Sequence, residues 1–290
     1  MSTRRQFIQQ AALGAAVAPF VSPLEWIAPP RHIGVQLWSV REDMKKDAKG
    51  TLEAIAKMGY REVEPFGFDS GQLFGMSYKD FSSVLKANGM KMHSTHCGMG
   101  VKNYDTAAKD ITDATKKLID DAAASGLKYI IAPYLMQDER NQFETLVALL
   151  NAAGKYAKKA GIRFGYHNHD FEYTTKHADG RNLMEWMLHE TDPAWVTFEM
   201  DLYWVVKAGY NPLDMFRLYP GRFELCHVKD MADTAQHETI EVGDGIISFR
   251  DIFKKSAQAG LKYYIVELEN YVTTPMQGID KARKNLVKII

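Results

Sequence analysis

One short pattern recurs along this chain and limits the folds that it can adopt: an amphipathic helical stretch, then glycine, an apolar residue, a basic residue and an apolar run. A helix commonly ends with a residue at positive φ, a conformation that costs glycine little. We therefore interpret each copy of the pattern as a junction between a helix and the strand that follows it. The copies are Gly59-Tyr60-Arg61, Gly89-Met90-Lys91, Gly126-Leu127-Lys128, Gly161-Ile162-Arg163 and Gly260-Leu261-Lys262, with a variant at Gly221-Arg222-Phe223.

The junctions space eight predicted strands along the chain. The interval from Gly161 to Gly221 is about twice as long as the others, and residues 196–201 supply the strand that it requires. Helices are predicted between the strands, among them 51–58, 106–125 with Asp105 as its N-cap, 142–160 and 212–219. Eight βα units predict an α/β fold, a single-domain (β/α)8 TIM barrel, rather than a doubly wound sheet, for which an early GxGxxG turn is missing. The predicted strands are 33–38, 62–66, 91–95, 129–133, 163–167, 196–201, 223–228 and 263–267.

Residues 1–30 are predicted to precede the barrel, which we expect to span residues 31–290. Thr3-Arg4-Arg5-Gln6-Phe7-Ile8 is a twin-arginine pattern, and the apolar stretch 11–21 behind it has no acidic residue and is too short to span a bilayer. The pattern indicates a Tat-type export signal. It predicts a periplasmic or secreted protein that uses the Tat machinery and has no stable membrane anchor. The alternative is an amphipathic N-terminal helix.

Charge and cysteine content narrow the classes of partner. The 36 basic and 36 acidic residues balance, so the chain offers no basic field for a nucleic-acid backbone, and we expect no nucleic-acid partner. Cys97 and Cys226 are the only cysteines and show no CxxC spacing. Their predicted strands lie on opposite sides of the barrel, too far apart for a disulfide. The sequence leaves a homo-oligomer open.

Ionisable residues collect at the carboxyl ends of the predicted strands, which is where barrel active sites lie. Burying so many charges side by side is costly unless a cation or a substrate compensates them. Histidine and carboxylate ligands without thiolate suit a divalent metal such as Mn, Co, Zn or Mg. The strand ends are Glu62-Val63-Glu64, His93-Ser94-Thr95-His96, His167-Asn168-His169, Glu199-Met200-Asp201, His227-Val228-Lys229-Asp230 and Glu267-Leu268-Glu269.

At these residues, and from Gly34 through Val242-Gly243-Asp244-Gly245 to Glu267, the chain resembles the sugar phosphate isomerase/epimerase family of xylose-isomerase-like TIM barrels, which includes inosose dehydratase and tagatose epimerase relatives. The resemblance implies metal ligands Glu, Asp, His and Glu from the fifth to eighth strands. Carried over by position, the last three are Asp201, His227 and Glu267. Where the family has the first glutamate this chain has His167, with His169 and Glu172 as alternates.

The resemblance also implies an enzyme that acts on a sugar, keto-sugar or cyclic polyol by removing a proton next to a carbonyl. In the family's epimerases the two glutamates act as paired acid and base, so His167 in place of one of them favours one-sided proton abstraction: isomerisation, dehydration or elimination. We expect a metal to polarise the carbonyl, a carboxylate or histidine such as Glu267 or His167 to remove the proton, and Lys229 to stabilise the oxyanion. His96 and Glu64 complete the predicted catalytic set.

Several of these residues also have a structural interpretation. In addition, the sequence leaves two alternative hypotheses for the function. Lys229, Glu199 and Glu269 are also typical of a structural ion-pair layer at a barrel end. The first alternative function is phosphodiester cleavage, since apurinic endonucleases share the barrel, although they need further ligands and a basic face. The second is a non-catalytic carbohydrate-binding barrel.

Overall fold

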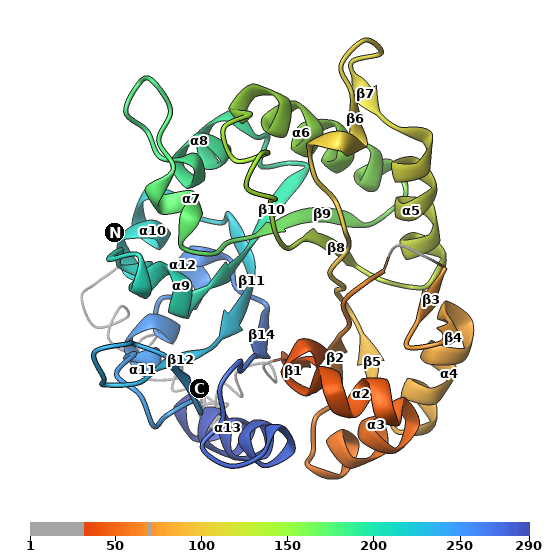
Figure 1. Cartoon of the computed structure of the whole chain (residues 1–290), viewed down its shortest axis with the longest axis vertical. Coiled ribbons are helices and arrows are strands. Elements are labelled where there is room, and N and C mark those ends of the chain that lie inside the picture. Colours follow the sequence, from red (N-terminus) through yellow and green to blue (C-terminus); the bar gives the residue numbers. More distant parts are fainter. Residues whose placement is uncertain (1–31, 69–70) are drawn as a thin grey trace, which may run out of the picture. The chain divides into compact units, whose positions relative to one another are not determined.

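The structure is a computed structural model that describes residues 32–68 and 71–290, so the twin-arginine stretch lies outside the described residues. Eight parallel strands form one sheet in the order β5-β2-β1-β14-β11-β10-β9-β8, with helices around it (Figure 1). Each strand lies where the sequence predicts one, with ends that differ by up to three residues. The strands are β1 (His32–Gln36), β2 (Glu62–Glu64), β5 (Lys91–Met92), β8 (Tyr129–Ala132), β9 (Arg163–His167), β10 (Val196–Asp201), β11 (Phe223–Val228) and β14 (Tyr263–Val266).

The sheet closes between its two outer strands. Ile131 of β8 forms a parallel bridge with His96, which follows β5. The Ile131 amide donates to the Thr95 carbonyl at 2.9 Å, and the Cys97 amide donates to the Ile131 carbonyl at 2.9 Å. These bonds satisfy the backbone groups that an open edge would expose. The (β/α)8 barrel predicted from the sequence is therefore confirmed.

The predicted junctions are confirmed by backbone geometry, since all six junction glycines have φ between 67° and 97°. The predicted helix over 106–125 is wrong in its first half. Helix α5 begins at Asp113, capped by Thr112, whose Oγ1 accepts from the Thr115 amide at 3.3 Å. Asp105 instead accepts from the amides of Ala107 and Ala108 in a hairpin turn. Aspartate side chains favour such turns as well as helix caps, so its type did not decide between them.

The other elements connect or cover the barrel strands. No helix in the described ranges is long and apolar enough to cross a membrane. The helices are η1 (Leu37–Val40), α2 (Arg41–Lys46), α3 (Ala48–Lys57), α4 (Tyr78–Ala87), η2 (Val101–Asn103), α5 (Asp113–Ala124), α6 (Phe143–Lys159), α7 (Phe171–Thr174), α8 (Leu183–Glu190), α9 (Leu202–Lys207), α10 (Pro212–Leu218), α11 (Phe249–Phe253), α12 (Ser256–Ala259) and α13 (Pro275–Ile289). The short strands are β3 (Gln72–Leu73), β4 (Met76–Ser77), β6 (Tyr104–Asp105), β7 (Asp110–Ile111), β12 (Asp230–Met231) and β13 (Thr239–Ile240).

Side chains that point into the barrel form an apolar cluster between two polar ends. The cluster consists of Tyr129, Ile131, Leu225, Tyr263 and Ile265, which alternate along their strands with residues of the larger outer core. At the amino ends of the strands, Glu62 lies 2.5 Å from His32 and 3.4 Å from His93, measured to its Oε1. The carboxyl ends carry the larger set of ionisable groups.

Both cysteines are buried in this framework. The Cys97 thiol donates to the Ile131 carbonyl at 3.4 Å, and the Cys226 thiol donates to the Tyr263 carbonyl at 3.7 Å. Cys97 follows β5 and Cys226 lies in β11, with β2, β1 and β14 between these strands in the sheet.

Candidate active site

Four neighbouring strands bring the four predicted metal ligands together. His167, Asp201, His227 and Glu267 come from the ends of β9, β10, β11 and β14, and one donor atom from each lies within 4.8 Å of the others. His167 Nε2 is 3.5 Å from Asp201 Oδ2, and His227 Nδ1 is 3.1 Å from Glu267 Oε2. All four side chains are buried. We call these four residues the four-donor group.

The donors of this group fit a divalent cation. His167 Nε2 is buried and forms no hydrogen bond, which is costly for a polar atom unless another partner binds it. Asp201 Oδ2 is also buried, and the Lys229 ammonium lies 3.1 Å from it. Burial, followed by the charges of His227 and His96, holds the pKa of His167 well below its usual value. With the Pro133 carbonyl 3.3 Å from Nδ1, a neutral imidazole donates there and presents the lone pair of Nε2 to the group.

Lys229 lies beside the same carboxylates. Its Nζ is 3.1 Å from Asp201 Oδ2, 2.8 Å from Glu267 Oε2 and 2.7 Å from Glu269 Oε1, and its side chain is only 1% exposed. Burial would by itself lower the pKa of this ammonium, but the three carboxylates hold that pKa well above its usual value. Lys229 is therefore a fixed positive charge at the edge of the four-donor group.

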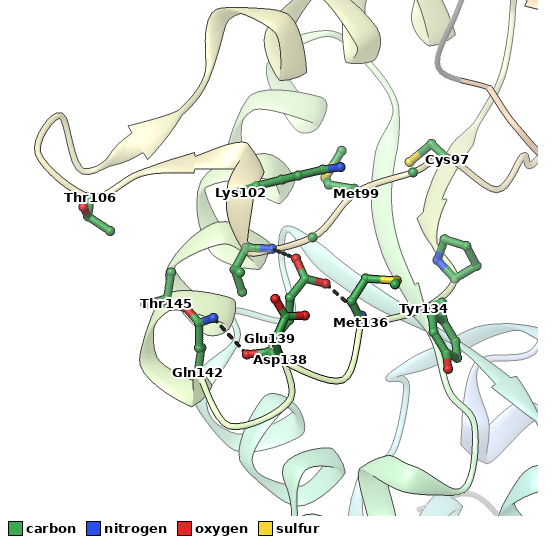
Figure 2. A pocket seen from close by; sticks show the side chains of 14 residues that line it. Cys97, Met99, Lys102, Thr106, Tyr134, Met136, Asp138, Glu139, Gln142 and Thr145 are labelled. Atoms are coloured by element: carbon green, nitrogen blue, oxygen red, sulfur yellow. Dashed lines mark hydrogen bonds between the residues drawn. The ribbon is translucent and has the colours of Figure 1, made fainter.

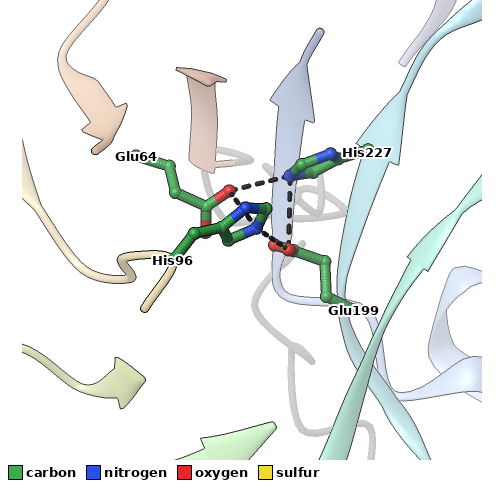
Figure 3. A group of neighbouring side chains, drawn as sticks. All are labelled: Glu64, His96, Glu199 and His227. Atoms are coloured by element: carbon green, nitrogen blue, oxygen red, sulfur yellow. Dashed lines mark hydrogen bonds and ion pairs between the residues drawn. The ribbon is translucent and has the colours of Figure 1, made fainter. Parts of the chain in front are cut away.

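A second cluster shares His227 with the four-donor group (Figure 3). It contains Glu64, His96, Glu199 and His227. His96 Nε2 is 2.7 Å from Glu199 Oε2, and His227 Nε2 is 2.7 Å from Glu64 Oε2. The two ring nitrogens of His227 thus face different clusters. The predicted residues Glu64 and His96 are both present, together with Glu199, for which the sequence left a functional and a structural role open.

The two buried carboxyl groups of this cluster differ in acidity. Burial and the negative charge of Glu64 raise the pKa of Glu199 to about 7. Burial would also raise the pKa of Glu64, but the charges of His96 and His227 lower that pKa to about 2. The same neighbours act on His96, where Glu64 and Glu199 outweigh burial and raise the pKa of the imidazole. The cluster therefore favours the protonated form of His96.

The two alternates for the fifth-strand ligand lie elsewhere. Glu172 is buried on the other side of β9, where its Oε1 accepts from the Tyr166 hydroxyl at 2.6 Å and its Oε2 accepts from the His169 amide at 2.8 Å. It belongs to no metal-competent cluster among the described residues. His169 contacts His167 with ring centroids 5.0 Å apart but lies outside the four-donor group. The fifth-strand corner is therefore occupied by His167.

A cavity of about 610 Å³ opens onto the four-donor group. This volume is in the usual range for a small-molecule site. Aromatic side chains from several loops form much of its wall, and they offer flat apolar faces to a ring-shaped ligand. The lining includes Trp38, Phe66, His96, Tyr134, His167, His169, Trp204, Glu267 and Glu269.

A closed parallel barrel with histidines and carboxylates at the carboxyl ends of its strands defines the class of this protein. The chain belongs to the xylose isomerase-like TIM barrel family, whose model matches residues 52–289. The family resemblance inferred from the sequence is thereby confirmed.

Three relatives illustrate the similarity. A sugar phosphate isomerase/epimerase from Parabacteroides distasonis ATCC 8503 superposes with a TM-score of 0.78 at 28% identity, covering 89% of this chain and 98% of that one. The IOLI protein with a bound zinc atom superposes with a TM-score of 0.68 at 18% identity, covering 89% and 97%, and supports the fold alone. Inosose dehydratase 2 of Bacillus cereus is 27% identical over 162 residues, 49% of this chain and 53% of that protein. The chain spans about half the length of the curated relatives that it matches.

Proposed function

We propose that this protein is a divalent-metal-dependent enzyme that acts on a sugar, keto-sugar or cyclic polyol by removing a proton next to a carbonyl. The observation that carries the proposal is the four-donor group, whose ligand atoms lie within 4.8 Å of one another beside a cavity of about 610 Å³. The family and its sugar-modifying relatives support the same reaction class.

The residues that face the cavity supply a carboxylate as base and a histidine as acid. A divalent ion held by the four-donor group would polarise a substrate carbonyl and so acidify the neighbouring C–H bond. Burial would raise the pKa of Glu267, but Lys229 and His227 hold that pKa well below its usual value, so Glu267 is the ionised base. His96 lines the same cavity, and Glu64 and Glu199 raise the pKa of its imidazole, so we assign it as the acid.

This asymmetry favours elimination over epimerisation. A symmetric epimerisation uses two similar groups on opposite faces of one carbon, whereas elimination removes a proton at one carbon and donates one to a leaving oxygen at the next. Glu267 and His96 suit the second task. Lys229 Nζ, 2.8 Å from Glu267, is engaged by three carboxylates and does not line the cavity, so it would stabilise the enolate oxygen by its charge and not by a hydrogen bond.

The proposal is tested by chelation and reloading. The protein is treated with EDTA and dialysed, then assayed with Mn²⁺, Co²⁺, Zn²⁺ or Mg²⁺ on an inosose, on ketohexoses and on keto-glycosides. Turnover should vanish on chelation and return with at least one metal. Asp201→Asn should remain inactive after reloading, whereas the exposed control Asp214→Asn should behave like the wild type.

Three outcomes would count against the proposal. Turnover that survives complete metal removal would refute metal dependence. Ligand binding without turnover in either form would favour the carbohydrate-binding barrel, and nicking of abasic DNA would favour the phosphodiesterase.

We also propose that the protein is exported through its twin-arginine stretch. The support is the pattern Arg4-Arg5 ahead of an apolar stretch without acidic residues. Fractionation of cells that express the full chain should place it outside the cytoplasm. Replacing both arginines by lysine should retain it inside, and an unchanged distribution would refute the proposal.

A further inference from the structure

A second cavity of about 600 Å³ adjoins the catalytic one (Figure 2). The two cavities share part of their lining, namely Cys97, Gly98, Pro133 and Tyr134. The two cavities are therefore neighbouring lobes that meet at these residues. We call the lobe at the four-donor group the catalytic lobe and the other one the outer lobe.

The outer lobe has fixed walls. Glu139 joins the loop after β5 to the loop after β8, because its Oε1 accepts from the Val101 amide at 2.9 Å and its Oε2 accepts from the Met136 amide at 2.9 Å. Its side chain is buried, and Gly100 packs so close that a Cβ there would overlap the carboxylate. A lobe held by backbone hydrogen bonds is largely formed before a ligand arrives.

The lining of the outer lobe suits recognition of a sugar ring. Tyr134 stands where the lobes meet and is 45% exposed, and Met136 beside it is 62% exposed, so both offer apolar surface. Lys102 and Asp138, both labelled in Figure 2, line the lobe and are exposed. They can offer a cation and an anion to hydroxyl groups. Flat apolar faces together with such hydrogen-bonding groups match the two surfaces of a pyranose.

The metal-competent clusters of the described residues lie outside the outer lobe. Neither the four-donor group nor the cluster of Glu64, His96, Glu199 and His227 contributes to its lining. A group bound there is held rather than converted. A free monosaccharide that reacts in the catalytic lobe would leave the outer lobe filled with water.

We propose that the substrate is a disaccharide-type glycoside, with the reacting keto-sugar ring in the catalytic lobe and a second sugar ring in the outer lobe. This inference rests on the proposed function, because it assigns the reacting ring to that site. The second ring supplies binding energy away from the reacting atoms, which raises kcat/KM.

The kinetic test compares a keto-disaccharide with the matching free keto-monosaccharide on the metal-loaded enzyme. Wild type should show a kcat/KM at least about tenfold higher for the disaccharide, equivalent to about 1.4 kcal/mol. Thr145→Trp fills the outer lobe from helix α6 and should abolish this preference while leaving the monosaccharide within about twofold of wild type. Glu144→Trp, on the exposed side of the same helix, is the matched control and should retain the preference.

A binding measurement separates this inference from the proposed function. Cellobiose and maltose are titrated into the wild type and Thr145→Trp and followed by saturation-transfer NMR. If neither keto-sugar is turned over, the proposed function fails. The NMR signals of cellobiose and maltose then still test whether the outer lobe binds a sugar ring. Binding lost in Thr145→Trp but kept in Glu144→Trp supports the outer lobe as a sugar subsite. Equal kcat/KM for both substrates, unchanged disaccharide binding in Thr145→Trp, or preference for an aryl glycoside over the disaccharide would overturn it.

Discussion

Replacing Lys229 by methionine would remove a buried ammonium while keeping a side chain of similar length. Its Nζ lies 2.8 Å from Glu267 and 3.1 Å from Asp201, both buried, and 2.7 Å from Glu269. The carboxylate of Glu269 is 34% exposed, so water can solvate it after the substitution. The cost therefore arises from Asp201 and Glu267, which would face each other with less compensating charge.

The size of this cost follows from the burial of the pair. Removing one partner of a buried ion pair destabilises a protein by about 3–5 kcal/mol, and protonation of one carboxyl would relieve part of that. We expect metal-free Lys229→Met to lose about 3 kcal/mol of unfolding free energy, or roughly 6–12 °C in Tm for a domain of this size. A divalent ion neutralises the same carboxylates, so the loss should be clearly smaller in the metal-loaded protein.

Urea unfolding of wild type and variant, in EDTA and in excess Mn²⁺, measures the loss of unfolding free energy in the metal-free and in the metal-loaded protein. Lys254→Met is the matched control, because Lys254 pairs with Asp251 on the surface with 66% of its side chain exposed, and it should change stability by less than about 0.5 kcal/mol. If Lys229→Met is as stable as wild type in EDTA, the ion pairs of Lys229 with Asp201 and Glu267 do not contribute to the unfolding free energy. If the loss is the same with and without metal, the cation does not bind beside them.

Four further variants test the site and the buried Glu172 behind it. His167→Ala should weaken divalent-metal binding in calorimetry by at least about tenfold, and a larger loss in His169→Ala would show that the wrong histidine has been assigned as ligand. His96→Asn should lower kcat by about 10²–10⁴-fold at unchanged metal content; full activity would exclude it as the acid. Burial raises the pKa of Glu172 to about 8 from 4.5, so its contribution to stability is complete below pH 4.5 and is lost as pH rises towards 8. Glu172→Gln should therefore gain stability relative to wild type between pH 5 and pH 9 in urea unfolding, and an unchanged difference would contradict the shift.

The fold could be predicted because its decisive signals are local. A glycine at a helix end constrains one φ angle, and repeating that constraint along the chain is enough to define the αβ junctions and the strands after them. The failure at Asp105 is local too: a hairpin turn and a helix cap use the same aspartate hydrogen bonds. Only the packing of the 104–111 hairpin decides between them.

The site could be predicted only as far as strand alternation reaches. The family resemblance implied Asp201 and Glu267 as ligands, and both have inward-facing side chains at the ends of their strands, as strand alternation predicts. Alternation also puts Glu199 on the same side of β10 as Asp201, a signal that could have identified it. Glu172 lies beyond the strand in α7, where alternation no longer applies, and the hydroxyl of Tyr166 draws it to the other side of β9.

His227 explains why so many charged groups are buried together. Its Nδ1 faces Glu267 at 3.1 Å and its Nε2 faces Glu64 at 2.7 Å, so one ring links the four-donor group to the cluster that holds His96. If a cation takes the place of the proton on Nδ1, the Nε2–H group still donates to Glu64, which then acts as a positioning residue for that ligand. Glu199 has the matching role for His96 on the other side. The second- and sixth-strand glutamates therefore orient the proposed ligand His227 and the proposed acid His96 at one end of a single barrel.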